Sequence, residues 1–445
     1  MTTSLKSIKC SLNKFRLVLK NFCSSPEKFA KNPGVDFSRK RKISAYDVIS
    51  TILCMTGGTI AKEIEEYFGA KEDIVSTSAF IQQRNKFAPE AFRLLLHTIV
   101  DSYANLATYK GHRVLAVDGS DLQIPTDKEN VDSYFAGSPT QSPYNLEHID
   151  ALYDVLNKIY LDASFVGKHK VSETAALCLL VERSNISDAL VLADRGYENY
   201  NVMAHILEKG WMFLIRVKNA DSNGIAFRLG LPVNKAFDKT IVLHLTRSYR
   251  KQAKALYKTQ PNYKHLSDKQ VFDYLPLKND WNTPAVWYDL PIRIVCFEIG
   301  NGTFETIITS LDAEEFPAME IKRLYNMRWG IETSFRSVKY TMGMLYVHSK
   351  KMEYIFQEIY ARFIMYNFTQ IIISHITIER GKTKYRYTIE FTSAFRYCRQ
   401  LFLGNISPKT ADVMIRKRKV PLRPNRKHPR IHKKTRTFSF TYRLS

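Results

Sequence analysis

The stretch YNMRWGIETSFRSVK, residues 325–339, places one carboxylate among aromatic and cationic side chains. On an α-helix, which turns by about 100° per residue, Arg328, Glu332 and Lys339 lie within roughly 60° of Tyr325. One helix face then carries a hydroxyl, a guanidinium, a carboxylate and an ammonium group. The carboxylate of such a face can bind a metal ion, and its cations can bind phosphate oxygens. The pattern therefore indicates phosphodiester chemistry.

The same stretch also has a simpler interpretation as a solvated helix face. Glu332 and Arg336 are four residues apart, a spacing at which ordinary helix salt bridges form and contribute only about 0.2–0.5 kcal/mol. Two further carboxylates at the ends of strands would favour the metal site, because rigid elements hold metal ligands in position. The rest of the sequence therefore has to supply two acids.

Two apolar runs each end in an aspartate. RVLAVDGSD, residues 113–121, reaches Asp118 before a glycine, and ALVLADRGY, residues 189–197, reaches Asp194 in the same way. Both runs are typical of buried strands that deliver an acid at the carboxyl end. Taken singly, either aspartate could instead cap a helix or form an Asx-turn. The order Asp, Asp, Glu along the chain favours the functional interpretation.

The spacing Tyr-x2-Arg-x3-Glu-x6-Lys resembles the signature of the IS4-family DDE transposases. Asp118-Gly119-Ser120 resembles the first aspartate motif of that family, and Asp194-Arg195-Gly196-Tyr197 resembles the second. The resemblance covers residues 113–339, about half of the chain. It implies that three carboxylates bind two divalent ions, Mg²⁺ with Mn²⁺ able to substitute, and that nearby side chains contact DNA phosphates. The implied metal ligands and catalytic residues are Asp118, Asp194 and Glu332, and the implied DNA contacts here are Tyr325, Arg328, Arg336 and Lys339.

The resemblance also implies an activity and partners. The enzyme would cleave double-stranded DNA at the terminal inverted repeats of an insertion sequence and transfer the strands into target DNA, through a hairpin intermediate. A homodimer would bridge the two ends, in the bacterial cytoplasm and associated with the nucleoid. Two alternatives stay open: a non-catalytic DNA-binding protein derived from a transposase, and a metal-dependent structure-specific nuclease.

Three other aspartates could compete for a catalytic role. Asp121 lies three residues after Asp118, and Asp154 and Asp162 lie in a neighbouring β-like region. We rank all three below Asp118, because a solvent-facing or structural role is the default for such positions.

The order of expected elements indicates an α/β fold. Strands are expected near 113–118, 151–156 and 158–164, followed by a helix at 171–183, the Asp194 strand, a helix at 199–209 and a strand at 211–217. This order fits an RNase H-like core with Asp118 and Asp194 on adjacent strands. The long interval before Glu332 predicts a β-rich insertion, in which Trp281 or Trp287 could stack on a base or, more commonly, belong to the core. The expected parts are an N-terminal helical domain at 1–110, the first core segment at 111–218, the insertion at 219–290, the second core segment with the catalytic helix at 291–375, and a helical segment with a basic tail at 376–445.

The N-terminal part is predicted to be helical, with expected helices at 45–55, 59–68 and 78–87. Two short helices around a turn suggest a helix-turn-helix DNA reader, although an ordinary helical packing domain is nearly as well supported. In the last helix, Gln83, Arg84 and Lys86 would reach base edges and phosphates.

The charge of the chain favours a polyanionic partner. Its 66 Lys and Arg against 43 Asp and Glu give a net charge of +23, for which nucleic acid is the simplest explanation. Residues 409–436 contain twelve of these cations and one acid, so we expect an extended tail that neutralises DNA phosphates. No apolar run approaches the roughly 18 residues of a membrane-spanning helix. The tail residues singled out for DNA binding are Arg416, Lys417, Arg418 and Lys419.

The cysteines and histidines offer no second metal site in the sequence. The six cysteines form no CxxC pair, which is consistent with free thiols in a reducing cytosol. His428 and His432 have helical metal-ligand spacing, but Pro429 between them argues against a helix.

Overall fold

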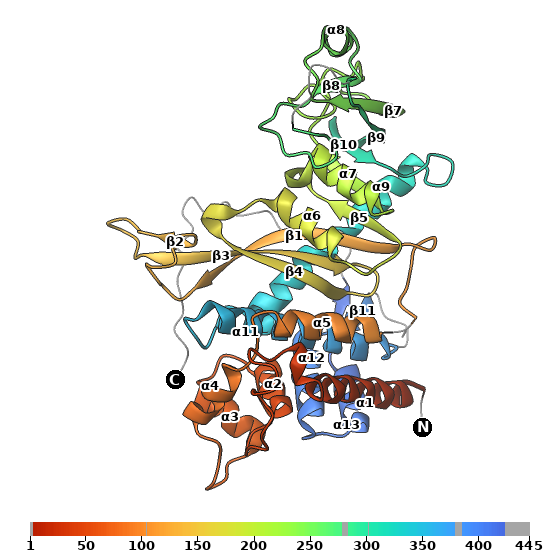
Figure 1. Ribbon diagram of the computed structural model, residues 1–445. Coiled ribbons are helices and arrows are strands. Elements are labelled where there is room, and N and C mark those ends of the chain that lie inside the picture. Colours follow the sequence, from red (N-terminus) through yellow and green to blue (C-terminus); the bar gives the residue numbers. More distant parts are fainter. Residues whose placement is uncertain (1–2, 104, 278–283, 301, 379–384, 423–445) are drawn as a thin grey trace.

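The computed structural model describes residues 3–103, 105–277, 284–300, 302–378 and 385–422. One large twisted sheet crosses the middle of the molecule, and the N- and C-terminal helices are stacked in layers below it (Figure 1). The sheet is mixed, with parallel and antiparallel pairs, and helices cover both of its faces. The expectation of an α/β protein is therefore confirmed. None of the described helices is both long and apolar enough to cross a membrane.

The sheet contains ten strands, in the order β2-β3-β1-β5-β6-β10-β9-β7-β8, and β4 pairs with β3. The strands expected from their apolar runs all form. Their bounds are β1 Arg113–Ile124, β2 Tyr134–Phe135, β3 Tyr144–Asp154, β4 Ile159–Gly167, β5 Ala189–Ala193, β6 Met212–Val217, β7 Phe237–Thr246, β8 Tyr263–His265, β9 Tyr288–Gly300 and β10 Thr303–Thr309.

The segment expected to be a β-rich insertion extends the large sheet instead of forming a sheet of its own. Strand β7 pairs antiparallel with β9 from Phe237 opposite Cys296 to Leu245 opposite Tyr288. The apolar side chains of both strands, such as Leu243 and Ile292, are buried, so the insertion covers an edge that would otherwise stay exposed. Helix α8 (Lys251–Thr259) and β8 complete this end of the molecule.

Of the two tryptophans considered for base stacking, only one is described. Trp287 is half-buried, and its ring packs edge-on against Tyr263 at a centroid distance of 5.2 Å. This contact favours the alternative in which Trp287 belongs to the core. Trp281 lies outside the described residues.

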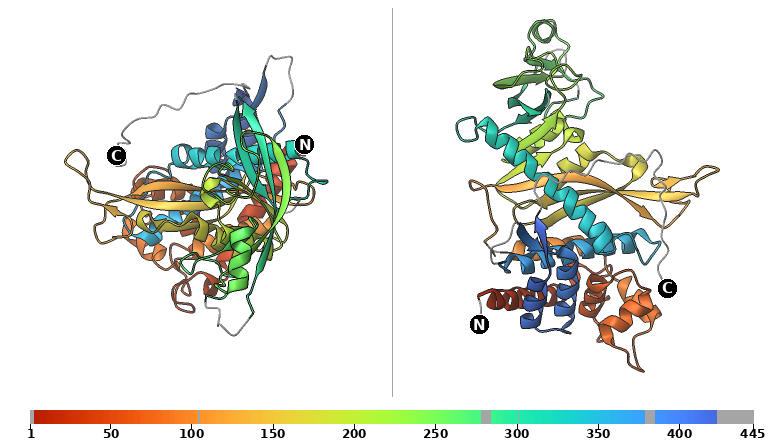
Figure 2. Two further views of the ribbon diagram at one scale, coloured as in Figure 1. Left: turned by 90° about the horizontal axis from the view of Figure 1, so that it is seen from above. Right: turned by 180° about the vertical axis from the view of Figure 1, so that it is seen from behind.

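Helices pack on both faces of the sheet. Helices α6 and α7 lie on one face, and the rod formed by α9, α10 and a π-helical turn crosses the other (Figure 2). Serine and asparagine N-caps begin α6 and α7, at Ser172 and Asn199. The bounds are α6 Glu173–Glu182, α7 Tyr200–Glu208, α9 Ala318–Met327, α10 Trp329–Arg336 and the π-helix Ser337–Thr341.

The helical half contains the N-terminal helices and the last part of the chain. Helix α11 lies with α5 between the sheet and the outer helices, and it is buried along most of its length. Helices expected at 45–55 and 59–68 form, with Ser44 and Thr59 as N-caps, and the one expected at 78–87 ends earlier, at Arg84. The bounds are α1 Thr3–Cys23, α2 Ala45–Cys54, α3 Ile60–Phe68, α4 Thr77–Arg84, α5 Ala91–Ser102, α11 Met352–Ser374, α12 Phe391–Leu403 and α13 Pro408–Lys417.

The basic C-terminal stretch is folded as far as it is described, so the expectation of an extended tail is wrong there. Ser407 caps α13, Pro408 occupies its first turn, and Ala411 and Ile415 are buried, which gives the helix a reason to form. Strand β12 (Lys419–Leu422) then pairs with β11 (Arg386–Ile389). The remainder of the tail, with His428 and His432, lies outside the described residues.

Arg84 is not the exposed DNA-contacting residue that the sequence suggested. Its side chain is only 1% exposed, donates at 2.8 Å to Gln357 and lies 3.0 Å from a Glu358 oxygen. Burial alone would raise the pKa of Glu358, but the charges of Arg84 and His348 lower it to about 2. The expectation failed because these partners lie on α11, more than 260 residues further along the chain. Arg84 therefore joins the N-terminal helices to α11.

We expect Arg84→Ala to lower the free energy of unfolding by about 3–5 kcal/mol, because it removes one of the two cations that lie within about 3 Å of the buried Glu358 carboxylate. Urea denaturation followed by circular dichroism measures the change. The control is Lys86→Ala, since Lys86 is half-buried and its ammonium lies over the Phe37 ring at 5.6 Å, a contact of about 1 kcal/mol or less. Equal effects of the two substitutions would contradict the structural role of Arg84.

Candidate active site

The two aspartates lie just beyond the segment in which two parallel strands pair. Asp194 directly follows β5, but β1 continues past Asp118 to Ile124, so the expectation of a strand that delivers Asp118 at its carboxyl end is wrong. Strands β1 and β5 pair from Arg113 opposite Ala189 to Ala116 opposite Leu192. Asp118 lies two residues after Ala116, and Asp194 lies two residues after Leu192. The register therefore brings both acids to the same end of the paired strands. The expectation that they lie on adjacent strands is confirmed. The carboxyl ends of adjacent parallel strands are a common position for ligand sites in α/β sheets.

The third acid comes from the helical rod on the sheet. Arg328, between α9 and α10, has helical backbone angles of φ −50° and ψ −36°, so the two helices run on almost continuously. Ile331 and Phe335 are buried beneath the rod, and Glu332 lies on the flank between them. Gly330 packs over β3 at an ordinary contact distance, since a Cβ there would lie 3.7 Å from the Tyr153 ring.

Arg328 is the central charge of the site. Its Nη2 lies 2.9 Å from a Glu332 oxygen and 3.9 Å from an Asp194 oxygen, and the whole residue is only 2% exposed. Its guanidinium lies over the rings of Trp329 and Tyr325, at 5.0 Å and 5.7 Å from their centroids. The guanidinium thus links two of the three acids in this conformation.

Asp194 has two further partners. Nη2 of Arg216, on β6, lies 2.6 Å from one Asp194 oxygen, and the Tyr325 hydroxyl donates to the same oxygen at 3.4 Å. The sequence analysis did not identify Arg216. A signal for it was present, because an arginine interrupts the otherwise apolar run of β6.

Asp118 has an unusual protonation equilibrium. Burial raises the pKa of its carboxyl group to about 6, and the charges of Glu332 and Asp194 act in the same direction. The charge of Arg328 and a 3.1 Å hydrogen bond from the Gly119 N–H oppose this increase. A cation bound beside the carboxylates would relieve their mutual repulsion.

The chemistry of these side chains suits a divalent ion, but their present arrangement does not. Carboxylate oxygens are the ligands that Mg²⁺ prefers, and three acids influence one another here. In the described part of the chain, however, no group of three acids, histidines or cysteines is arranged so that it could hold a metal ion. Arg328, which bridges Glu332 and Asp194, would have to move for an ion to take its place.

The other implied contacts lie along the same rod. Lys339, in the π-helical turn, donates from Nζ to the backbone oxygen of Asp121, close to the end of β1. Arg336 is exposed, and Tyr325 is buried with its hydroxyl toward Asp194. The structure therefore brings Tyr325, Arg328, Glu332 and Lys339 to the aspartate edge of the sheet, with Arg336 on the solvent side.

The three competing aspartates are each held by cations. Asp121 accepts from His148 at 2.6 Å and from Lys168 at 2.7 Å. Asp154 is completely buried and forms a 2.5 Å ion pair with Arg113. Such partners indicate structural roles.

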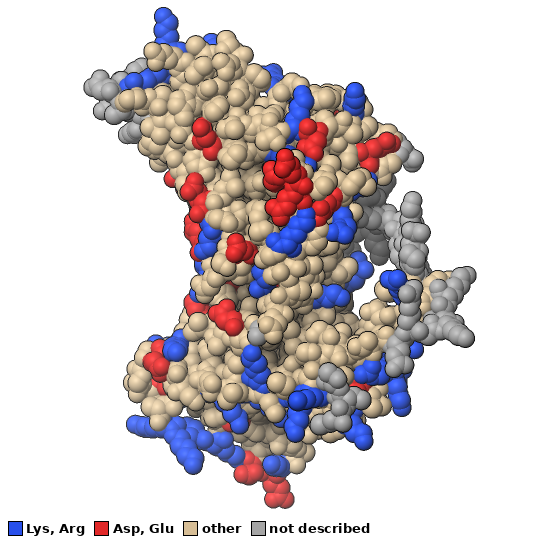
Figure 3. All heavy atoms as spheres, turned by 90° about the vertical axis from the view of Figure 1, so that its right-hand side faces the viewer, with Lys and Arg blue, Asp and Glu red and all other residues tan. Residues whose placement is uncertain are grey.

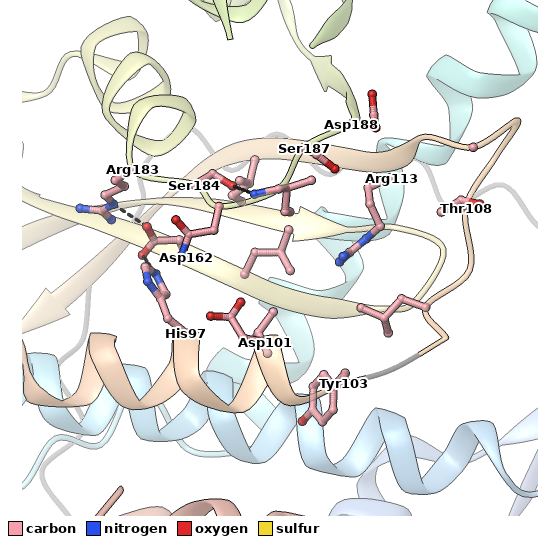
Figure 4. Close-up of a pocket in the computed structure, with 17 residues that line it drawn as sticks. His97, Asp101, Tyr103, Thr108, Arg113, Asp162, Arg183, Ser184, Ser187 and Asp188 are labelled. Atoms are coloured by element: carbon pink, nitrogen blue, oxygen red, sulfur yellow. Dashed lines mark hydrogen bonds and ion pairs between the residues drawn. The ribbon is translucent and has the colours of Figure 1, made fainter. Parts of the chain in front are cut away.

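Asp162 belongs to a separate cavity. It contacts Arg183, and His97 lies 3.2 Å away (Figure 4). The cavity has a volume of about 380 Å³, and Arg113 and Asp188 at its edge mark the amino ends of β1 and β5. Asp162 pairs with Leu152, which pairs with Val117, so it lies level with the residue before Asp118, and the alternation of side chains along a strand directs it to the other face of the sheet.

A family model described as the transposase DDE domain matches residues 109–368. The match covers more than half of the chain and includes Asp118, Asp194 and Glu332. The chain therefore belongs to the DDE transposase family, and the family predicted from the motifs is confirmed.

Similar proteins include transposases of known elements. The chain is 24% identical over 318 residues to "Transposase InsG for insertion sequence element IS4" of Escherichia coli (strain K12), a match that covers 69% of this chain and 63% of the relative. The matched part thus spans less than two thirds of that protein. Among solved structures, a piggyBac transposase synaptic complex with hairpin DNA aligns with a TM-score of 0.46 and 10% identity, over 91% of this chain and 81% of the other.

We expect Gly119→Ala to destabilise the protein by about 1–3 kcal/mol, because its Cβ would lie 2.5 Å from His148 Nε2 inside a packed region. Thermal unfolding measures the effect. Gly330→Ala is the matched control: its Cβ meets nothing closer than 3.7 Å, and alanine favours the helix by about 1 kcal/mol. A destabilised Gly330→Ala together with an unchanged Gly119→Ala would contradict this packing.

Proposed function

We propose that this protein is a DDE transposase that cleaves DNA at the ends of an insertion sequence and joins those ends to target DNA. One observation carries the proposal: Asp118 and Asp194 lie two residues beyond the paired segment of two parallel strands, and Arg328, on the same helical rod as Glu332, contacts Glu332 and Asp194. The strand order and the helices on both faces support an RNase H-like core, with the β7–β8 segment as an insertion.

The chemistry follows from the charges at the site. Asp118, Asp194 and Glu332 would hold two Mg²⁺ ions, for which Mn²⁺ can substitute. Ions bound there would lower the pKa of an attacking water and stabilise the departing 3′ oxygen. The freed 3′ hydroxyl is then the nucleophile of strand transfer, and attack on the opposite strand would give a hairpin intermediate.

Arg328 has the donors that a phosphate needs. Its Nε and Nη1 are buried and have no hydrogen-bond partner among the described residues. An arginine with free donors beside carboxylates can bind a phosphate oxygen once an ion neutralises those acids. Tyr325, Arg336 and Lys339 would contact the same DNA backbone.

A basic cavity supports DNA binding by the N-terminal helices. It has a volume of about 450 Å³ and lies between the end of α1, the loop before α2 and Gln83 on α4. Lys20 and the cations of residues 39–41 line it, and its lining includes no acid. Gln83 therefore remains a proposed DNA contact, together with the half-buried Lys86.

The same charge asymmetry extends over the surface. On the face in Figure 3, Lys and Arg side chains gather in the lower, helical half, and a group of acidic side chains lies higher, over the sheet half. Together with the exposed cations of α13 and β12, this surface favours double-stranded DNA as the partner, both inverted-repeat ends and target. A homodimer that bridges two ends, acting in the bacterial cytoplasm at the nucleoid, completes the proposal.

A non-catalytic DNA-binding protein derived from a transposase is the second candidate. It is favoured by the bridging position of Arg328, which leaves the acids without a metal-ready arrangement. Incubation with labelled inverted-repeat ends, plasmid and Mg²⁺ separates the candidates. Joined products identify a transposase, cleavage alone identifies a structure-specific nuclease, and retarded mobility alone identifies a binder.

We expect Glu332→Ala to bind end DNA with unchanged affinity and to lose cleavage by at least about a hundredfold, because one metal ligand is removed. Gel retardation and strand cleavage measure the two properties. Glu353→Ala, which removes a half-buried acid of α11 that pairs with Lys31, should cleave normally. Cleavage at the wild-type rate by the Glu332 variant would refute the assignment.

We expect the triple substitution of Lys417, Arg418 and Lys419 by Gln to weaken DNA binding and to flatten its salt dependence. The log–log slope should fall by about 0.9 for each DNA phosphate that the variant no longer neutralises. Arg416 is kept, because it also hydrogen-bonds Asp412 within α13.

Binding curves at several salt concentrations measure this slope. The control replaces three exposed lysines of α8, Lys251, Lys254 and Lys258, and so removes the same charge at the opposite end of the molecule. An equal change of slope in both triple variants would argue against a specific role for the C-terminal cations.

A further inference from the structure

The backbone does not by itself fix the distance between Asp118 and Asp194. Pairing of β1 with β5 stops at Ala116 opposite Leu192, two residues before each acid. Strand β1 then continues along β3, whereas the chain after β5 turns into the 3₁₀ helix Arg195–Tyr197. A contact beyond the paired region must therefore hold the Asp194 turn against the strand that carries Asp118.

A buried hydrogen bond makes this contact. The Tyr197 hydroxyl donates to Oδ1 of Asp150 at 3.1 Å, and these residues are 1% and 0% exposed. Tyr197 closes the 3₁₀ turn that Asp194 caps, since the Asp194 side chain accepts from the Arg195 N–H. Asp150 is the cross-strand partner of Gly119, the residue after Asp118. One hydroxyl thus ties the turn of one acid to the strand of the other.

A histidine lies beside the acceptor of this bond. His148 Nε2 lies 3.5 Å from Asp150 Oδ1, and its Nδ1 lies 2.6 Å from Asp121, which Lys168 also contacts at 2.7 Å. The imidazole packs against the bare Cα of Gly119. A fully buried carboxylate needs such a cation, because an uncompensated charge costs several kcal/mol.

These contacts form a continuous side-chain connection, which we name the β3 bridge: Tyr197, Asp150, His148 and Asp121. It begins three residues after Asp194 and ends three residues after Asp118. We propose that Tyr197, Asp150 and His148 are positioning residues that set the separation of the two aspartates and thereby the affinity for the divalent ion. This inference rests on the proposed function, and none of the three residues needs to touch the ion or the DNA.

The test removes one hydroxyl from the bridge. Tyr197→Phe keeps the buried ring but loses its hydrogen bond to Asp150. We expect the complex of the variant with end DNA to bind Mn²⁺ about two- to tenfold more weakly, the range that corresponds to one hydrogen bond. Electron paramagnetic resonance of free Mn²⁺ measures this affinity without any turnover. Cleavage should require correspondingly more Mg²⁺ and approach the wild-type rate at saturation.

A second buried tyrosine provides the matched control. Tyr360 on α11 is also buried, and its hydroxyl donates to the Ala163 carbonyl at 2.9 Å, away from the acids. Tyr360→Phe should leave Mn²⁺ binding unchanged. Wild-type Mn²⁺ affinity in Tyr197→Phe, or an equal loss in Tyr360→Phe, would overturn the inference.

A double variant tests whether Tyr197 acts through Asp150. If it does, Tyr197→Phe combined with Asp150→Asn binds Mn²⁺ no more weakly than Asp150→Asn alone. Additive losses would overturn the connection. The proposed function is tested separately by Asp118→Asn. If the wild-type protein binds no Mn²⁺, or if the Asp118→Asn variant binds Mn²⁺ as tightly as the wild type, the metal site is refuted and the inference with it.

Discussion

The register between β1 and β5 is the constraint on which the candidate site depends. Side chains alternate along a strand, so a slip of one residue would turn one of the two aspartates to the other face of the sheet. The apolar residues of both strands are completely buried, which fixes that register strongly. The hydrophobic core thus determines where the two charges lie, although neither charge contributes to the core.

The candidate site brings several carboxylates close together. Three acids meet where burial raises the pKa of Asp118 to about 6, and Arg328 balances two of them from within the same helical rod. An arginine at this position can act in two ways. It neutralises acids in this structure, and under the proposed function it would bind a phosphate once an ion had replaced it.

Local sequence patterns predicted the strands and helices around the acids, because apolar runs, glycines and caps act over a few residues. They could not reveal contacts between distant parts of the chain. Arg84 resembled a DNA-contacting residue until α11 placed Gln357 and Glu358 beside it. Arg216 reaches Asp194 from a strand that carries no motif. The way in which β7 joins the large sheet, and the folded start of the basic tail, depend on pairing with β9 and β11, which composition does not encode.

Helix α11 has a consequence for how the protein can be divided. It is buried on the side of the sheet, where Asn367 hydrogen-bonds the backbone of Tyr160, and on the side of the N-terminal helices, where Arg84 contacts it. Excising the first hundred residues would expose an apolar flank of α11 and leave the Glu358 carboxylate without Arg84. Exposed apolar surfaces of this kind promote aggregation. The N-terminal helices and the large sheet therefore share one central helix, and neither part packs independently of it.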